Sequence, residues 1–144
     1  MCDWWKVIRT GLIAGLVMLV VSFALMPLWT ALFPSIAEEY ANIVVFRPWG
    51  DTLMNLFVLQ PFIAGITLAY VFEKVGGVFK QKKYLDRGLA FGFMIWVVSG
   101  IPGMFATYTS FQLSEAMVFS WLAGGLVQLL FGGVVIAWAW SRKK

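Results

Sequence analysis

Long stretches of apolar residues dominate the chain and predict membrane-spanning helices. Four stretches carry no charged residue: 10–37, 52–72, 88–114 and 116–141. Each is long enough to cross the hydrocarbon core, which takes about 20 helical residues. The short alternating segments typical of a transmembrane β-barrel do not occur. We therefore expect an all-α integral membrane protein in which residues 1–144 form a single domain of four transmembrane helices.

Composition points the same way, because 61% of the 144 residues are hydrophobic and only 12% are charged. Soluble domains carry about 45–50% apolar and about 25% charged residues. The first apolar stretch follows Lys6 and Arg9, as in a signal peptide. It is longer than the roughly 7–15 apolar residues of a signal sequence, so we expect it to be kept as the first span.

The basic residues indicate the orientation. Of the 11, all but Arg47 lie before the first stretch, between the second and third, or after the fourth. Since Lys and Arg accumulate on cytoplasmic loops, the pattern predicts a multi-pass protein of the cell inner (plasma) membrane with both termini in the cytoplasm. The basic loop "KVGGVFKQKKYLDR" is then a topology signal, and we expect no nucleic-acid partner.

The loop after the first span, "PSIAEEYANIVVFRP", predicts a short helix of its own. Ser35 and Glu38 have the spacing of a capping box. The residues on one face of this helix would be Ile36, Tyr40, Ile43 and Val44. We expect an amphipathic helix on the outer membrane surface; a docking surface for a partner is the alternative.

Two pairs of segments indicate an internal repeat. Residues 11–22, "GLIAGLVMLVVS", align with 88–99, "GLAFGFMIWVVS", and residues 59–72 align with 127–140. The second alignment matches Gln60 with Gln128. Coincidence is the competing explanation, because apolar segments draw on few residue types.

If the repeat is real, residues 9–74 and 87–142 form two parallel pseudo-repeated hairpins. Repeats of this kind tend to place a central site at their interface, near mid-bilayer. The candidate residues for a polar mid-membrane site are Gln60, Gln128, Asn55 and Ser99. The alternative is that the amides form hydrogen bonds between helices, which contribute about 0.6 kcal/mol each.

A second group of polar residues lies where helices two and three should reach the outer surface. It would form an outer vestibule from Asp51, Thr107, Tyr108 and Thr109. A hydrated interfacial rim is the alternative for these residues.

Pro61 and Pro102 lie inside predicted spans and should break the helices there. Proline lacks the N–H that would bond the carbonyl four residues earlier. The carbonyls left free should be those of Phe57 and Val98.

The residues that most enzymes use are missing. The chain contains no histidine and one cysteine, Cys2. We therefore expect no His-ligated metal centre, no activated nucleophile and no cofactor. The chain should not be an enzyme.

The stretches "TLMNLFVLQPFIAGITLAYVFEK" and "GLAFGFMIWVVSGIPGMFATYTSF" resemble small bacterial four-helix inner-membrane proteins of unknown function, a resemblance that covers most of the chain. Locally, "GIPGMFATYTSF" is similar to the third-helix break of the fluoride channels. That resemblance implies a structural sodium ion at Thr107, Tyr108 and Thr109. The chain departs from the channels in lacking their first-helix arginine after paired glycines.

Two functions remain open at this point. The first is a non-enzymatic accessory or structural subunit of a membrane complex, held in the lipid bilayer with a membrane protein partner or as a homo-oligomer. The alternative is a channel or transporter for a small solute or ion, with a polar mid-membrane constriction.

Overall fold

The computed structural model describes residues 3–42, 44–48 and 50–142, and over them the fold is entirely helical. Four continuous helical stretches are long and apolar enough to cross a membrane, which confirms the predicted all-α fold of four spans. The elements are α1 (Trp4–Leu32), α2 (Ser35–Tyr40), η1 (Thr52–Leu59), α3 (Gln60–Val75), η2 (Gly76–Val78), α4 (Tyr84–Ile95), η3 (Trp96–Gly100), α5 (Ile101–Ser110) and α6 (Glu115–Ser141).

The first span begins and ends earlier than its apolar pattern indicates. It begins at Trp4 because the Asp3 side chain accepts a hydrogen bond from the Lys6 N–H, at 3.1 Å, and so caps the helix. It ends at Leu32, and Pro34 follows two residues later. Proline disfavours a helical conformation in the residue before it, which explains the break between α1 and α2.

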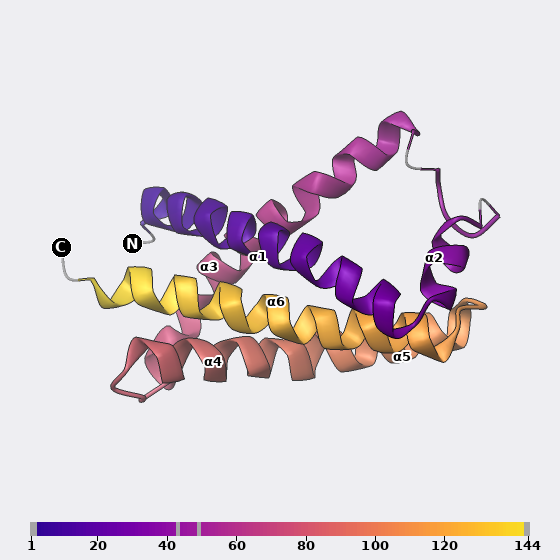
Figure 1. Cartoon of the computed structure of the whole chain (residues 1–144). Helices are drawn as coiled ribbons and strands as arrows, with labels where there is room; N and C mark the ends of the chain where they lie inside the picture. Colours follow the sequence, from indigo (N-terminus) through magenta and orange to yellow (C-terminus); the bar gives the residue numbers. More distant parts are fainter. Residues whose placement is uncertain (1–2, 43, 49, 143–144) are drawn as a thin grey trace.

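The helices pack as a layered bundle with a distinct basic end. Figure 1 shows α6 running between α1 on one side and α4 and α5 on the other. Both termini lie at the end of the bundle that also carries the loop at 79–83, which we call the basic end. Helix α2 lies at the opposite end, which we call the distal end.

Close backbone contacts at glycines hold the spans together in pairs. A Cβ atom on Gly65 of α3 would overlap the backbone of Gly11 and Gly15 on α1. A Cβ atom on Gly133 of α6 would likewise overlap the backbone of Gly88 on α4. Only glycine permits this approach, and close packing replaces the hydrophobic drive that lipid does not supply.

The core lies in the half of the bundle toward the basic end. There the Phe72 ring of α3 meets Phe91 of α4 edge to face, with centroids 5.0 Å apart, and Trp140 of α6 at 5.8 Å. Such aromatic pairs contribute about 0.5–1.5 kcal/mol beyond their burial. Met18 and Ile136 are buried in the same cluster, so side chains fill the space between the helices in this half of the bundle.

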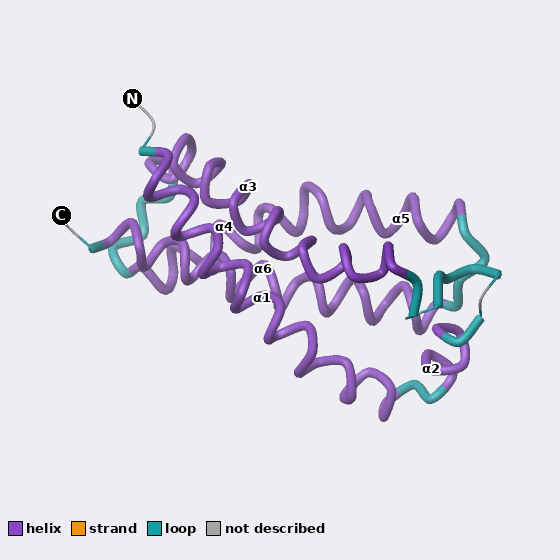
Figure 2. The backbone as a smooth tube through the Cα atoms, turned by 90° about the horizontal axis from the view of Figure 1, so that it is seen from above, coloured by secondary structure: helices purple, strands orange, loops and turns teal. Residues whose placement is uncertain are grey.

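The distal half is open by comparison. Figures 1 and 2 both show η1 diverging from the distal part of α1. No residue of η1 is buried, and Leu53, Leu56 and Phe57 are each more than half exposed. The helices therefore leave a space between them at this end.

Each proline lies next to a change in helix type. Before Pro61 the chain forms eight residues of 3₁₀-helix, in which the Gln60 N–H bonds the Phe57 carbonyl. The Phe57 carbonyl is therefore satisfied, contrary to the expectation that Pro61 leaves it free. Before Pro102 the chain forms a five-residue π-helix, and the Ile101 N–H bonds the Trp96 carbonyl. Both prolines occupy the first turn of the α-helix that follows, where proline is tolerated.

Helix α2 exists as expected, but its capping box does not form. Ser35 is the first helical residue, and Pro34 precedes it with no side-chain cap. The Glu39 carboxylate instead accepts a hydrogen bond from the Ser114 N–H, at 3.2 Å, which ties α2 to the start of α6. Ile36 is buried, whereas Val44 is 90% exposed because the helix ends at Tyr40. Ile43 lies outside the described residues.

Candidate functional site

A cavity fills the space left by the divergence of η1 and has a volume of about 810 Å³. Its walls come from the distal half of α1, from α2, from η1 and the start of α3, and from α6. Apolar and aromatic side chains make up most of the lining, among them Leu19, Phe23, Trp29, Phe46 and Phe57. The cavity ends toward the basic end at the packed core.

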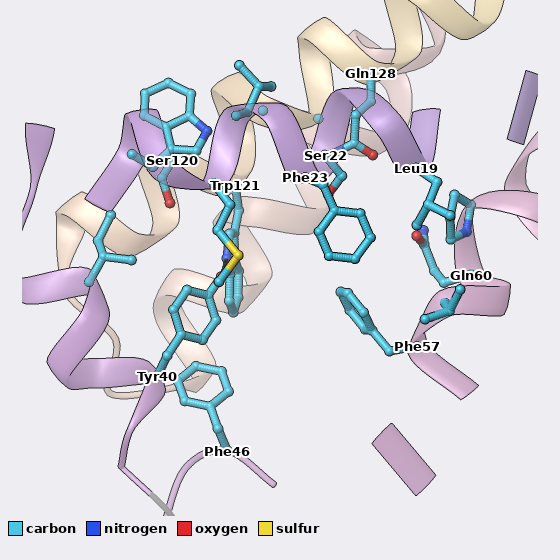
Figure 3. Close-up of a pocket in the computed structure, with 18 of the residues that line it drawn as sticks. Leu19, Ser22, Phe23, Tyr40, Phe46, Phe57, Gln60, Ser120, Trp121 and Gln128 are labelled. Atoms are coloured by element: carbon cyan, nitrogen blue, oxygen red, sulfur yellow. Dashed lines mark hydrogen bonds between the residues drawn. The ribbon is translucent and has the colours of Figure 1, made fainter. Parts of the chain in front are cut away.

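Polar side chains without partners face this cavity. Ser22 of α1, Gln60 of α3 and Gln128 of α6 all line it, and none has a side-chain hydrogen bond to a described residue. Figure 3 shows the Gln128 amide pointing into the cavity beside Ser22, with Gln60 projecting toward Leu19. An unpaired amide in an apolar medium costs roughly 2–7 kcal/mol. These groups therefore need water or a bound molecule.

Near the distal end the lining is aromatic, and the polar groups of Tyr40 and Trp121 pair with each other. Trp121 of α6 donates its indole N–H to the Tyr40 hydroxyl of α2 at 2.6 Å, and the Phe46 ring lies against both. Burial raises the pKa of the Tyr40 hydroxyl above its usual value, and the Trp121 hydrogen bond opposes this effect. Tyr40 is therefore neutral at physiological pH.

One cation lies beside the cavity. Arg47 lines it and forms a salt bridge with Asp51 at 3.0 Å. The backbone N–H of Leu53 and the Arg47 guanidinium hold the pKa of Asp51 below its usual range. Among the described lining residues Arg47 carries the charge, and Asp51 balances it, so the cavity suits an uncharged molecule with hydrogen-bonding groups.

Three of the four residues expected in a mid-membrane site share the cavity. Gln60, Gln128 and Asn55 all line it, whereas Ser99 does not. Ser99 lies within the π-helix η3, is exposed, and donates its hydroxyl to the Ile95 carbonyl at 2.7 Å. A π-helix takes more residues per turn than an α-helix, so side chains within it point in directions that regular helical spacing does not predict.

The four residues expected to form an outer vestibule are not brought together around the cavity. Thr107 and Thr109 lie in the regular helix α5 and donate their hydroxyls to the carbonyls of Gly103 and Phe105. The Tyr108 hydroxyl donates to Glu115 at 3.3 Å. Asp51 caps η1 by accepting the Leu53 N–H at 2.8 Å.

Sequence reasoning overlooked Ser22, Tyr40 and Trp121 as parts of one site. Ser22 carries a sequence signal, because it aligns with Ser99 in the apparent repeat. Tyr40 and Trp121 are 81 positions apart, and no local pattern brings them together.

The lining offers binding groups rather than metal ligands. Among the described residues no group of three or more His, Cys, Asp or Glu side chains is placed to hold a metal ion. Amide, hydroxyl and indole groups set among apolar walls can orient a molecule by hydrogen bonds while its apolar part is buried.

No protein-family model matches the chain, and no curated protein or solved structure matches it.

Proposed function

We propose that the protein is a membrane carrier whose distal cavity binds a small, uncharged amphiphilic molecule. The observation that carries this proposal is that Ser22, Gln60 and Gln128, from three spans, face one cavity with their hydrogen-bonding groups unpaired. A solute with a polar group would bond them, and its apolar part would contact Leu19 and Phe23.

The size and chemistry of the cavity support this function. Ligand-binding pockets typically measure about 300–1,000 Å³ and combine apolar walls with a few polar groups. The cavity of about 810 Å³ lies within that range. The other use considered for the glutamines, bonding helices to one another, would require partners that they lack within the described structure.

The packed core favours a carrier over an open channel. Phe72, Phe91 and Ile136 close the bundle between the cavity and the basic end. A solute would cross only after these side chains separated. The 3₁₀ segment η1 and the π-helix η3 are the natural places for such bending, since both helix types often mark hinges or functional sites.

The pseudo-repeat belongs to the same proposal. Gly11, Gly15 and Gly65 align with Gly88, Gly92 and Gly133, and each set makes the close contact within its hairpin. Equivalent glycines at equivalent contacts support two parallel hairpins, 9–74 and 87–142. The cavity would then lie between the repeats, as in many carriers.

We also propose that the basic end faces the cytoplasm and that the membrane is the cell inner membrane. The two termini and the 79–83 loop share that end, and ten of the 11 basic residues lie in these segments or a few positions from them in the sequence. In this orientation the cavity is open on the opposite, outer side, where α2 would lie at the interface.

An accessory subunit of a membrane complex is the second candidate. Its support is the exposure of η1, on which Leu56 and Phe57 are 57% and 54% exposed beside the cavity. A transmembrane helix of a partner, or of a second copy, would cover them. In both functions the protein is not an enzyme.

The test is to purify the protein from its native membrane in mild detergent and to identify every small molecule and protein bound to it by mass spectrometry. Gly125→Leu should fill the cavity, because Gly125 lines it and an added Cβ meets nothing within 4 Å. Gly103→Leu is the matched control, since Gly103 also has open space but does not line the cavity.

We expect the wild type and Gly103→Leu to carry a bound amphiphilic molecule. Gly125→Leu should carry at least about tenfold less of it, which corresponds to a loss of about 1.4 kcal/mol in binding free energy. Equal recovery from all three proteins would reject the carrier. A stoichiometric membrane protein that is lost from Gly125→Leu would favour the accessory subunit.

A further inference from the structure

A second groove, at the basic end, has the chemistry of an anionic headgroup site. It has a volume of about 370 Å³ and lies between the start of α1 and the end of α6. Three cationic side chains, Lys6, Arg9 and Arg142, line it together with one carboxylate, Asp3. The groove is therefore net positive, and it is separate from the distal cavity.

The cations converge because of helical spacing on two neighbouring spans. Lys6, Arg9 and Ile13 are three or four residues apart and share one face of α1. Trp138 lies in the last turn of α6, and Arg142, four residues later, is the C-cap of this helix. The two helix faces thus meet with their basic groups on opposite walls.

The three cations are not neutralised by carboxylates. Neither Lys6, Arg9 nor Arg142 makes an ion pair with a described residue. Asp3 is engaged elsewhere, since its side chain accepts the Lys6 N–H and its own N–H donates to Glu73. The positive charge is therefore available to a ligand.

Tryptophan rings hold the cations in place. The Arg142 guanidinium carbon lies 3.9 Å from the Trp138 ring centroid. The Lys6 ammonium lies 4.8 Å from the Trp140 ring. Stacking of this kind fixes the position of a cation while leaving its N–H groups free to donate.

A neutral donor lies at the floor of the groove. Thr10 is only 5% exposed and lines the groove. Its hydroxyl has no hydrogen bond to a described residue, unlike Thr30 and Thr67, which bond carbonyls one turn earlier. This unpaired hydroxyl on a buried residue adds a directional donor to the three cations.

We propose that this groove binds the phosphate headgroup of an anionic phospholipid. The basic and tryptophan side chains stand at the ends of apolar spans, which is the depth of lipid headgroups. Ile13 and Trp138, 48% and 36% exposed, continue the groove toward the apolar part of the spans and would contact an acyl chain. Basic pockets between transmembrane helices bind anionic headgroups in this way. The proposal does not depend on what occupies the distal cavity.

The experiment is a titration of the purified, delipidated protein with phosphatidylglycerol, read by native mass spectrometry. Phosphatidylcholine tests whether net negative charge is required, and glycerol 3-phosphate tests whether a soluble phosphate suffices. The groove variant is Arg9→Gln/Arg142→Gln. The matched control is Lys82→Gln/Lys83→Gln, which removes the same charge from the 79–83 loop at the same end.

We expect one phosphatidylglycerol to bind the wild type and the loop variant alike, and the groove variant about 30-fold more weakly, as for the loss of two headgroup cations. Trp138→Leu, which removes no charge, should weaken phosphatidylglycerol binding several-fold. This variant tests the groove if the double variant does not fold. Equal weakening in groove and loop variants, or none in either, would overturn the site. If glycerol 3-phosphate bound as tightly as phosphatidylglycerol, the ligand of the groove would not be a lipid.

Discussion

The backbone of Gly65 on α3 lies so close to Gly11 on α1 that a Cβ atom at Gly65 would overlap the Gly11 carbonyl oxygen. Gly133 on α6 has the same relationship to the carbonyl oxygen of Gly88 on α4. A side chain at Gly65 or Gly133 would push two spans apart, because the atoms that it would overlap belong to backbone and not to flexible side chains. Each contact therefore fixes the spacing of the two helices within its own hairpin.

Gly65→Ala and Gly133→Ala should each destabilise the protein by about 1–3 kcal/mol, the usual cost of overpacking. Thermal unfolding in detergent measures the effect. Gly125→Ala is the control, since its added methyl meets nothing within 4 Å and alanine is the better helix former. Equal stability of Gly65→Ala and Gly125→Ala would contradict the close packing described here.

The four spans are predictable from sequence because apolar length alone sets them, as for α6 between Glu115 and Ser141. The residues at which the helices begin and end are less predictable, since they depend on single contacts such as the Asp3 cap of α1. The divergence of η1 is not predictable at all. It arises from a 3₁₀ segment of eight residues, unusually long for that helix type, which no hydrophobic pattern marks.

Gln128→Leu should leave the unfolding temperature unchanged or slightly raised while abolishing retention of the bound solute. The Gln128 amide has no hydrogen bond to a described residue, so leucine breaks no internal bond and adds apolar surface to the cavity wall. Thermal unfolding and mass spectrometry of bound molecules measure the two effects on the same sample. A marked loss of thermal stability with the solute retained would instead mean that Gln128 links helices.

The docking of α2 should be insensitive to pH until the solution is strongly alkaline. Because burial raises the pKa of Tyr40 above its usual 10.0, the stabilisation from its neutral form is complete below pH 10.0 and is lost as pH rises through the higher folded-state value. Amide hydrogen exchange of α2 as a function of pH, with correction for the intrinsic exchange rate, measures the docking. Tyr40→Phe is the control, in which the alkaline transition should vanish.

The residues of the candidate site were only partly predictable from the sequence, because some of them depend on irregular helix geometry and on tertiary contacts. Gln60 and Gln128 stand out because amides are rare in apolar spans, and both line the cavity. Ser99 does not line this cavity, since the direction of its side chain depends on the π-helix at Trp96–Gly100, whereas helical spacing assumes regular turns. The pairing of Tyr40 with Trp121 depends on how α2 folds back onto α6, which is a tertiary contact without a local signal.

Cysteine labelling should distinguish the hydrated cavity from the lipid-facing surface. In a Cys2→Ser background, Gln128→Cys should react with a membrane-impermeant thiol reagent, because the cavity that contains Gln128 must hold water when no solute is bound. Ser99→Cys should not react, since this exposed position lies outside the cavity on a membrane-spanning helix, where a thiol stays protonated in lipid. Protection of Gln128→Cys by the bound solute would link the hydrated cavity to binding. Equal reactivity at the two positions would mean that the cavity is not a distinct aqueous compartment, and the proposed carrier would lose its binding site.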